Sequence, residues 1–563
     1  MDTITPLKAP THQPKPPIGP ENASNAIPVE PLDLDESPKP RTKLRLYAIL
    51  SGLYLSLLVA ALDSTIVAIA IPRISAELHS AVGYVWIGGA YMLATAATSP
   101  IWSKCSDIWG RKSLLLIAVA LFAAASVLAA LSTNMTMLIA GRALQGAGCG
   151  GLSQLVTITI SDLFSVRKRS LYMGLIGFIW AFAGSVGPLL GGAFTEFASW
   201  RWCFWINLPI CGITFGLLLV FLDVHNPRTK LVDGAKAIDW IGTISILAIT
   251  LLLLVGLDLG GAIFPWSSPK VICLLVFGTL MIGFFIFTEQ RLAKYPIIPL
   301  DVFKNWSNNA TFLVASSQAM ILVGGEYYLP LFFQSVQQAS PLRSGVLMLP
   351  LIVTQAVVEI LAGVYIHRTG RYRESIWAGA AFMTLGTGLY ISLGTHTSVS
   401  VVVGLEIVGA LGPALLFQGP MIAIQNTVSQ AETAAATAAL GFVRNVAMAL
   451  SVVVGGVAFQ NSMDARQSSF IAAGLDKSTR EALSGSQAAA NVGITSSIKD
   501  ASQRQVVSEA FSWSMRNMFI MYTCLAAVAL LASAFVKHRD LNVEHTETTT
   551  GIEQLTKGRR TKA

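Results

Sequence analysis

Charged side chains inside long apolar runs are the residues of this sequence best placed to do chemistry. Asp63 lies in LDSTIVAIAIPRI (62–74), and Arg142 lies in GRALQGAGCGG (141–151). A carboxylate near the middle of a bilayer costs about 2.5–3.5 kcal/mol, even on the lenient insertion scale. A carboxylate and a guanidinium that meet in a dry interior offset each other's desolvation cost. We therefore predict that Arg142 pairs with Asp63. The alternative is that Arg142 extends to the outer membrane surface.

A second group of charged residues falls in the apolar runs of the second half of the chain. Acids in dry surroundings hold a proton more readily than exposed acids, so they are candidate proton carriers. The alternative for each of them is a structural hydrogen bond. The group consists of Glu326, Glu359, Glu406 and Arg444.

These residues need long membrane-crossing helices to position them, and the composition predicts such helices. The 563 residues are 53% hydrophobic and only 12% charged, too few charges for a soluble domain of this size. The net charge of +8 reflects basic residues in alternate short loops, which argues for membrane orientation and against nucleic-acid binding. Fourteen apolar runs are each long enough to cross about 30 Å of hydrocarbon. They are 46–70, 83–102, 114–132, 136–160, 171–194, 205–223, 238–257, 270–288, 311–335, 344–366, 376–395, 399–424, 434–459 and 516–536.

The basic loops set the orientation and the depth of the charged pair. If all fourteen runs cross the membrane, the basic segments share one side, and both termini are cytosolic. At 1.5 Å per residue, Asp63 lies about 25 Å and Arg142 about 27 Å from the cytosolic ends of their helices. The two side chains therefore reach a similar depth, as a pair requires.

The runs divide the chain into five predicted parts. Residues 1–45, with ten prolines by position 40, form a disordered cytosolic tail. A six-helix bundle spans 46–223, two extra linker helices span 238–288, and a second six-helix bundle spans 311–536. The second bundle includes an outward loop, 460–515, with short amphipathic helices on the membrane surface. Residues 537–563 form a cytosolic tail.

An internal echo suggests that the two bundles are related. The sequence SDIWGRKS follows the second run, and IHRTGRYRES follows the tenth, so Gly110-Arg111 and Gly370-Arg371 occupy matching places. Two related six-helix halves around a midplane site are a transporter architecture.

Small residues recur at helical spacing in the fifth run. GLIGFIWAFAGSVGPLLGG places Gly177, Ala181, Gly184 and Gly191 on one stripe. Such a stripe lets two helices approach closely, and Pro188 bends the helix.

With these motifs, the chain resembles the major facilitator superfamily, and most closely its fourteen-helix drug:proton antiporter branch. SKCSDIWGRKS (103–113) is similar to the loop motif after helix 2, and GRALQGAG (141–148) to the helix-4 motif. GSVGPLLGG (184–192) is similar to the antiporter motif of helix 5. The matching residues are Asp107, Gly110, Arg111, Lys112, Arg142, Gln145, Gly146, Gly148, Gly184, Gly187, Pro188, Gly191 and Gly192.

Four further segments extend the resemblance, which covers residues 45–536. LDSTIVAIAIP (62–72) is similar to a helix-1 motif of the fourteen-helix branch, and WRWCFWINLPI (200–210) to the segment that enters helix 6. The long outward loop and YYLPLFFQ (327–334) resemble fungal toxin and secondary-metabolite efflux pumps. Ser103 departs from the loop motif, which usually has glycine there.

The resemblance implies an all-α integral membrane protein with the major-facilitator fold. It implies that Asp107 and Arg111, with Gly110 and Lys112, form a conformational latch. It also implies that Arg142 assists proton transfer and that helix 5 lies between the halves. For proton coupling we name Asp63, Arg142, Glu326 and Glu406, and for the substrate cavity Gln145, Trp180, Tyr327 and Phe332.

Three classes of function are compatible with a chain of this kind. The first is a proton-coupled exporter of a small hydrophobic or amphipathic compound that works by alternating access. The second is an importer of the same fold, such as an iron-chelate (siderophore) transporter. The third is a membrane enzyme or receptor, which lacks support because no nucleophile–base constellation or clustered metal ligands stand out. An ATP-driven pump would need GxxxxGK[ST], which the chain lacks.

We expect a multi-pass protein of the plasma membrane, with a vacuolar or vesicle membrane as the alternative. Its partners would be a small-molecule substrate, protons and the lipid bilayer, without nucleic acid, cofactor or metal. We expect it to act as a monomer.

Overall fold

The computed structural model describes residues 42–78, 81–261, 264–298, 300–488, 491, 494–541 and 550–551. Most of the expected N-terminal tail and most of the expected C-terminal tail lie outside these residues. Every regular element in the described part of the chain is a helix, which confirms the all-α class.

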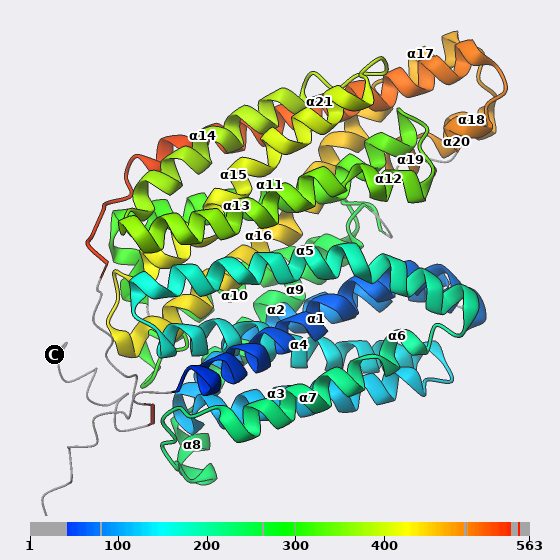
Figure 1. Ribbon diagram of the computed structural model, residues 1–563. Coiled ribbons are helices and arrows are strands. Elements are labelled where there is room, and N and C mark those ends of the chain that lie inside the picture. Colours follow the sequence, from blue (N-terminus) through cyan, green and yellow to red (C-terminus); the bar gives the residue numbers. More distant parts are fainter. Residues whose placement is uncertain are drawn as a thin grey trace, which may run out of the picture. The chain divides into compact units, whose positions relative to one another are not determined.

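The first group of helices, here called the N-terminal bundle, is drawn in blue to green in the lower part of Figure 1. The helix α1 packs on α2 through Tyr91, whose hydroxyl donates to the carbonyl of Ala60, and on α5 through Thr65. The long helix α5 contains Pro188. The bundle consists of α1 (Lys43–Glu77), α2 (Ala81–Trp109), α3 (Arg111–Ala130), α4 (Met135–Leu163), α5 (Val166–Phe197), α6 (Trp202–Trp205) and α7 (Asn207–Phe221).

Two linker helices follow the short helix α8 (Leu231–Ala237). They are α9 (Trp240–Leu259) and α10 (Pro269–Arg291), which pack against each other. The helix α9 also contacts α2 and, in the second bundle, α16. The linker pair therefore adjoins both bundles.

The second group of helices, here called the C-terminal bundle, is drawn in green to red in the upper part of Figure 1. Its core contains Tyr328, Phe332, Phe333, Tyr372 and Tyr522. It consists of α11 (Trp306–Ser335), α12 (Pro341–Leu347), α13 (Leu349–Thr369), α14 (Tyr372–Tyr390), α15 (Val399–Gln425), α16 (Thr433–Asp464) and α21 (Ala501–Ser533).

The predicted outward loop forms short helices, but its second half differs from the expectation. The short helices α17 (Gln467–Ala472), α18 (Lys477–Ala482), α19 (Gly485–Ala488) and α20 (Ile494–Ser497) follow α16. The segment VVSEAFSWSM, expected in the loop, instead belongs to α21, which begins at Ala501. Its Val507, Phe511 and Met515 are buried in the core of the bundle, which explains why the helix extends through this polar stretch.

All fourteen predicted runs coincide with helices or pairs of helices. Ten of these spans in the described chain are long and apolar enough to cross a membrane by length and hydropathy. The remaining runs correspond to α2, α4, α11 and α14. The helix α4 carries Arg142 and Gln145, polar side chains that lower its mean hydropathy. The count of fourteen crossings stays a prediction.

The glycines of the two Gly-Arg pairs both have positive φ. Gly110 has φ +89° where α2 passes into α3, and Gly370 has φ +74° where α13 ends before α14. Glycine adopts positive φ without the steric penalty that other residues meet. The echo in the sequence therefore corresponds to a glycine with positive φ between two helices in each bundle, although ψ is 152° at Gly110 and 2° at Gly370.

Hydrogen bonds join the two bundles at the helix ends that we predict to be cytosolic. Arg167, at the start of α5, donates to the carbonyls of His367 at 2.8 Å and Arg368 at 2.5 Å. Arg169 donates to Gln425 and Gln430, each at 3.2 Å. Helices α5 and α13 run side by side between the bundles. The conformation is therefore closed on this side.

Candidate functional site

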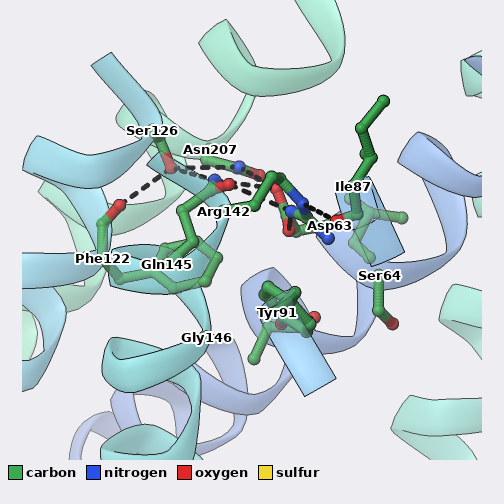
Figure 2. Close-up of polar contacts among 12 residues, drawn as sticks. Asp63, Ser64, Ile87, Tyr91, Phe122, Ser126, Arg142, Gln145, Gly146 and Asn207 are labelled. Carbon is green, nitrogen blue, oxygen red and sulfur yellow. Dashed lines mark hydrogen bonds and ion pairs between the residues drawn. The ribbon is translucent and has the colours of Figure 1, made fainter. Parts of the chain in front are cut away.

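Asp63 and Arg142 form a buried ion pair inside the N-terminal bundle (Figure 2). The Arg142 Nη1 lies 2.5 Å from Asp63 Oδ2, and the side chains are 2% and 0% exposed. Asp63 comes from α1 and Arg142 from α4. The predicted pairing is therefore present, and Arg142 does not extend to the outer surface.

The second carboxylate oxygen of Asp63 accepts hydrogen bonds from two amides. Gln145 Nε2 donates to Oδ1 at 3.0 Å, and Asn207 Nδ2 donates to the same atom at 2.7 Å. Both amides also donate to Ser126 Oγ, at 2.8 and 3.2 Å. Three donors thus surround a carboxylate, which in its ionised form can accept hydrogen bonds but cannot donate them. Protonation would turn one of its oxygens into a donor and displace at least one of these partners.

Arg142 is held by groups other than its carboxylate. Its Nε donates to the carbonyl of Ile87 at 3.0 Å, and Nη1 also donates to Gln145 Oε1 at 3.0 Å. The guanidinium lies over the ring of Tyr91, 4.2 Å from the centroid, where a cation–π interaction contributes. These contacts fix the guanidinium beside Asp63.

Gly146 explains how α4 comes close enough to α2 to form this cluster. A Cβ at Gly146 would overlap the backbone carbonyl of Tyr91. The hydroxyl of Thr95, on α2, donates to the carbonyl of Gly146 at 3.0 Å. Gly148 likewise lets α4 approach α3, since a Cβ there would lie 3.0 Å from Phe122. The glycines of GRALQGAG therefore permit the helix approach that places Arg142 and Gln145.

Sequence reasoning missed Asn207 and Ser126 as members of the cluster. Gln145 is fully buried and binds Asp63, and its predicted place in the substrate cavity stays a prediction. Asn207 could have been identified from the sequence, because it is a lone amide in the apolar segment CFWINLPICGI. Such an amide requires a polar partner when it is buried.

The residues of the predicted latch are in contact at the end of α2. Arg111 Nη1 lies 2.6 Å from Asp107 Oδ1, and its Nε lies 2.8 Å from Asp162 Oδ2. Arg111 is 2% exposed, and Lys112 is half-buried. Asp162, near the end of α4, is a partner that the sequence analysis did not name.

Ser103, which departs from the loop motif, forms a contact between the bundles. Its hydroxyl donates to the carbonyl of Ala434 on α16 at 3.2 Å, and the side chain is 1% exposed. The latch is therefore next to a point where α2 meets the C-terminal bundle.

The glycine stripe of α5 has two packing partners and an open stretch. A Cβ at Gly187 would overlap Thr65, and one at Gly191 would overlap the carbonyl of Ile66, both on α1. Gly177 instead faces Glu359 of α13, in the other bundle, whereas Gly184 and Gly192 have no neighbour within 4 Å. The stripe does not form one packing face, because α5 contacts α1 near one end and α13 near the other.

The charged residues of the C-terminal bundle are not gathered around one carboxylate. Arg444 donates to Gln318 Oε1 at 2.7 Å and to the carbonyl of Phe417 at 3.4 Å. Glu406 is fully buried, with both carboxylate oxygens lacking a hydrogen-bond partner among the described residues. Glu326 lies on an exposed part of α11, next to Tyr327. The structure thus places Asp63 and Arg142 together and Glu326 and Glu406 elsewhere.

The aromatic residues predicted to line the substrate cavity differ in their exposure. Trp180 is 40% exposed and Tyr327 is 54% exposed, so both side chains are accessible. Phe332 is fully buried beside Phe333 in the core of the C-terminal bundle, so it does not line an open site. Its predicted place in the substrate cavity stays a prediction, because an aromatic residue in a membrane helix has the same sequence signature whether it packs or lines a cavity.

Comparison with known proteins gives a consistent result. Residues 53–452 match the Major Facilitator Superfamily. The chain is 41% identical to the MFS-type transporter ppz2 of Metarhizium majus, over 98% of this chain and 95% of the relative. It is 42% identical to efflux pump dotC of Dothistroma septosporum, over 90% and 86% of the two chains. Efflux pump FUS6 of Gibberella fujikuroi is 35% identical, over 78% and 79%.

Solved structures of the same fold are similar in shape and distant in sequence. The human organic anion transporter MFSD10 has a TM-score of 0.53 at 16% identity, covering 85% of this chain and 99% of its own. The proton:xylose symporter XylE has a TM-score of 0.53 at 14% identity, covering 92% and 99%. These likenesses confirm the expected fold. Because the family match and the relatives extend over most of the sequence, the chain belongs to the major facilitator superfamily of membrane transporters.

Proposed function

We propose that this transporter exports a small hydrophobic or amphipathic compound in exchange for protons, by alternating access. The observation that carries the proposal is the buried Asp63 cluster, in which a titratable carboxylate holds together α1, α4 and α7. A proton arriving at Asp63 changes which of its three donors stay bound. Protonation at one place therefore alters the packing of three helices.

The direction of transport is supported by the relatives named efflux pumps and by the glycine motif of α5. An importer remains the alternative, and no observation favours it. Family membership makes the protein a transporter rather than an enzyme. The multi-pass chain belongs in a membrane, and we propose the plasma membrane and a monomeric state.

We propose that the alternating motion breaks and re-forms the contacts that hold the two bundles together in this conformation. Arg167 and Arg169 bridge the bundles, and the latch around Arg111 lies next to the contact of Ser103 with α16. Charged loop contacts of this kind break and re-form as two halves rock. The substrate would leave by the side opposite these contacts.

The test begins with the substrate. Metabolites retained in cells that lack the protein, and reduced in their medium, identify the transported compound. That compound is then offered to reconstituted vesicles under a proton gradient, with ATP held constant. Transport should collapse when a protonophore is added. Transport that follows ATP and ignores the gradient would refute proton coupling.

The proposed orientation has its own test. An epitope inserted at Arg480, in α18, should bind antibody on intact cells, whereas tags at the two termini should bind only after permeabilisation. A C-terminal tag that is accessible on intact cells would refute the count of fourteen crossings.

A further inference from the structure

The buried acid Glu359 lies where the two bundles meet, and neither the Asp63 cluster nor the latch includes it. Glu359 is on α13, and its side chain is 1% exposed. A Cβ at Gly177 of α5 would overlap Glu359 Oε2. Gly174, one turn earlier, would place a Cβ 3.1 Å from the carbonyl of Glu359. The carboxyl group is therefore enclosed between α13 and the glycine face of α5.

Gly363 extends the same close approach on the other helix. A Cβ at Gly363 of α13 would overlap the carbonyl of Ser170 on α5. Three glycines from two bundles thus bring the backbones together around one carboxyl group. Any separation of α5 from α13 would open a path for water to this group.

The hydrogen bonds of the carboxyl group suit its neutral form in this conformation. Oε1 accepts one hydrogen bond, from Gln355 Nε2 at 3.1 Å, and the buried Oε2 has no partner among the described residues. An ionised carboxylate needs several donors or a bound cation when it is removed from water. The carboxylate of Asp63, by contrast, has three hydrogen-bond donors.

The charged groups around Glu359 come from two other helices. Arg444 of α16 and Glu326 of α11 lie within electrostatic range of it. Arg444, however, donates to Gln318 and lies over the ring of Phe417, 4.7 Å from the centroid. The helix α5 presents glycines, and α15 presents the amide of Gln418, which donates to the main-chain carbonyl of Glu359 at 2.8 Å.

We propose that Glu359 is a proton-binding gate: its protonation permits α5 and α13 to close on the predicted cytosolic side. This inference rests on the proposed function and adds a gating residue to it. When the helices separate, water reaches the carboxyl group, its O–H bond breaks, and the proton passes to water on the cytosolic side. The carboxylate left behind is stable in water and unfavourable in the closed contact. Release of the proton therefore keeps that side open for the substrate to bind. The group takes a proton back from cytosolic water before the helices close, so it adds no proton to the exchange.

The test measures closure directly, as the distance between spin labels on the two helices. Lys168 in α5 and Thr369 in α13 are exposed and are replaced by Cys. The exposed Cys273 and Cys524 are replaced by Ser to prevent unwanted labelling. Distances are recorded on the full chain in lipid nanodiscs between about pH 5.5 and about pH 8.5. In the parent protein, the short-distance population should rise as the pH falls.

Three variants test whether Glu359 is the group that titrates. Glu359→Gln should show the short distance across the whole pH range. Gln355→Leu removes the one donor to the carboxylate, so the midpoint of closure should move up by about one pH unit, a tenfold change in proton binding. Glu289→Gln is the matched control, because Glu289 is a buried acid of α10 with one bonded oxygen and one that has no partner in the described part of the chain. Its midpoint should equal that of the parent.

Two outcomes would overturn the inference. One is a parent protein whose distance does not depend on pH. The other is a Glu359→Gln protein that keeps the parental midpoint and amplitude. If Glu359→Gln does not fold, an unchanged midpoint in Gln355→Leu overturns the inference in its place. Vesicle transport that still requires the proton gradient would then leave the proposed function standing and remove only Glu359 from it.

Discussion

The two bundles each bury an arginine and acids, but they satisfy them differently. In the N-terminal bundle, Arg142 binds Asp63, and Gln145 bonds to both of them. In the C-terminal bundle, Arg444 also binds a glutamine, Gln318, yet no carboxylate accepts from it in the described contacts. One bundle therefore holds an assembled ionic cluster, whereas the other buries Glu359 with one hydrogen-bond donor and Glu406 with none among the described residues. Proton exchange and conformational change would then be divided between the bundles.

The largest effect is expected where the ionic cluster is broken. Asp63→Asn and Arg142→Gln each leave the other charge buried and unpaired, at a cost of about 3–5 kcal/mol. Each variant should nearly abolish substrate-induced proton flux in vesicles. The double variant should fold better than either single variant, without recovering coupling, since no titratable group remains there.

Arg142→Lys should retain only part of the parental proton flux, because lysine keeps the charge and loses the planar fork that contacts Asp63 and Gln145. Thermal unfolding in detergent and proton flux are measured on all four proteins. Parental flux in Asp63→Asn would locate proton exchange in the C-terminal bundle, with Glu326 the next residue to test.

The second prediction concerns the close packing of α5 against α1. Gly191→Leu should abolish turnover while expression stays largely intact, because the side chain would meet the backbone of Ile66 on α1. Gly216→Leu in α7 is the control, since that glycine has no neighbour within 4 Å. Transport is measured at matched protein amounts. Normal transport by Gly191→Leu would show that α1 and α5 need not approach closely.

Much of this arrangement follows from the sequence, and the exceptions have physical reasons. The length of the apolar runs located the helices, and counting residues brought Asp63 and Arg142 to one depth. The contribution of Asn207 was hidden because its spacing from Asp63 is set by tertiary packing rather than by one helix. The direction of each glycine on α5 was hidden because periodicity defines a stripe without naming the helix it meets. The buried face at the start of α21 was not predicted, because that stretch of the sequence is polar.

The third prediction tests the asymmetry between the two arginines. Arg444→Met leaves a neutral amide and a carbonyl without a donor, rather than an unpaired carboxylate in direct contact. The expected loss in unfolding free energy is about 1–3 kcal/mol, smaller than that of Arg142→Gln. Thermal unfolding of both variants under the same conditions provides the comparison. An equal or larger loss in Arg444→Met would show that an acid of the C-terminal bundle depends on this cation.

The smallest effect is expected at an exposed pair in the N-terminal bundle, which has the same chemistry as the buried pair. Glu77 accepts from Arg201 at 2.9 Å and from Trp200 at 2.9 Å, and the side chains of Glu77 and Arg201 are 44% and 33% exposed. The hydrogen bond from Arg201 lowers the pKa of Glu77. A lowered carboxyl pKa stabilises the fold above the unfolded pKa, and the contribution is lost as the pH falls through the folded pKa. Water screens this pair, so Glu77→Gln should cost only about 0.2–1 kcal/mol near neutral pH. The difference from the parent, measured by thermal unfolding, should shrink as the pH falls from about 7 toward about 3. A loss at neutral pH as large as that of Asp63→Asn would show that burial is not what distinguishes the two pairs.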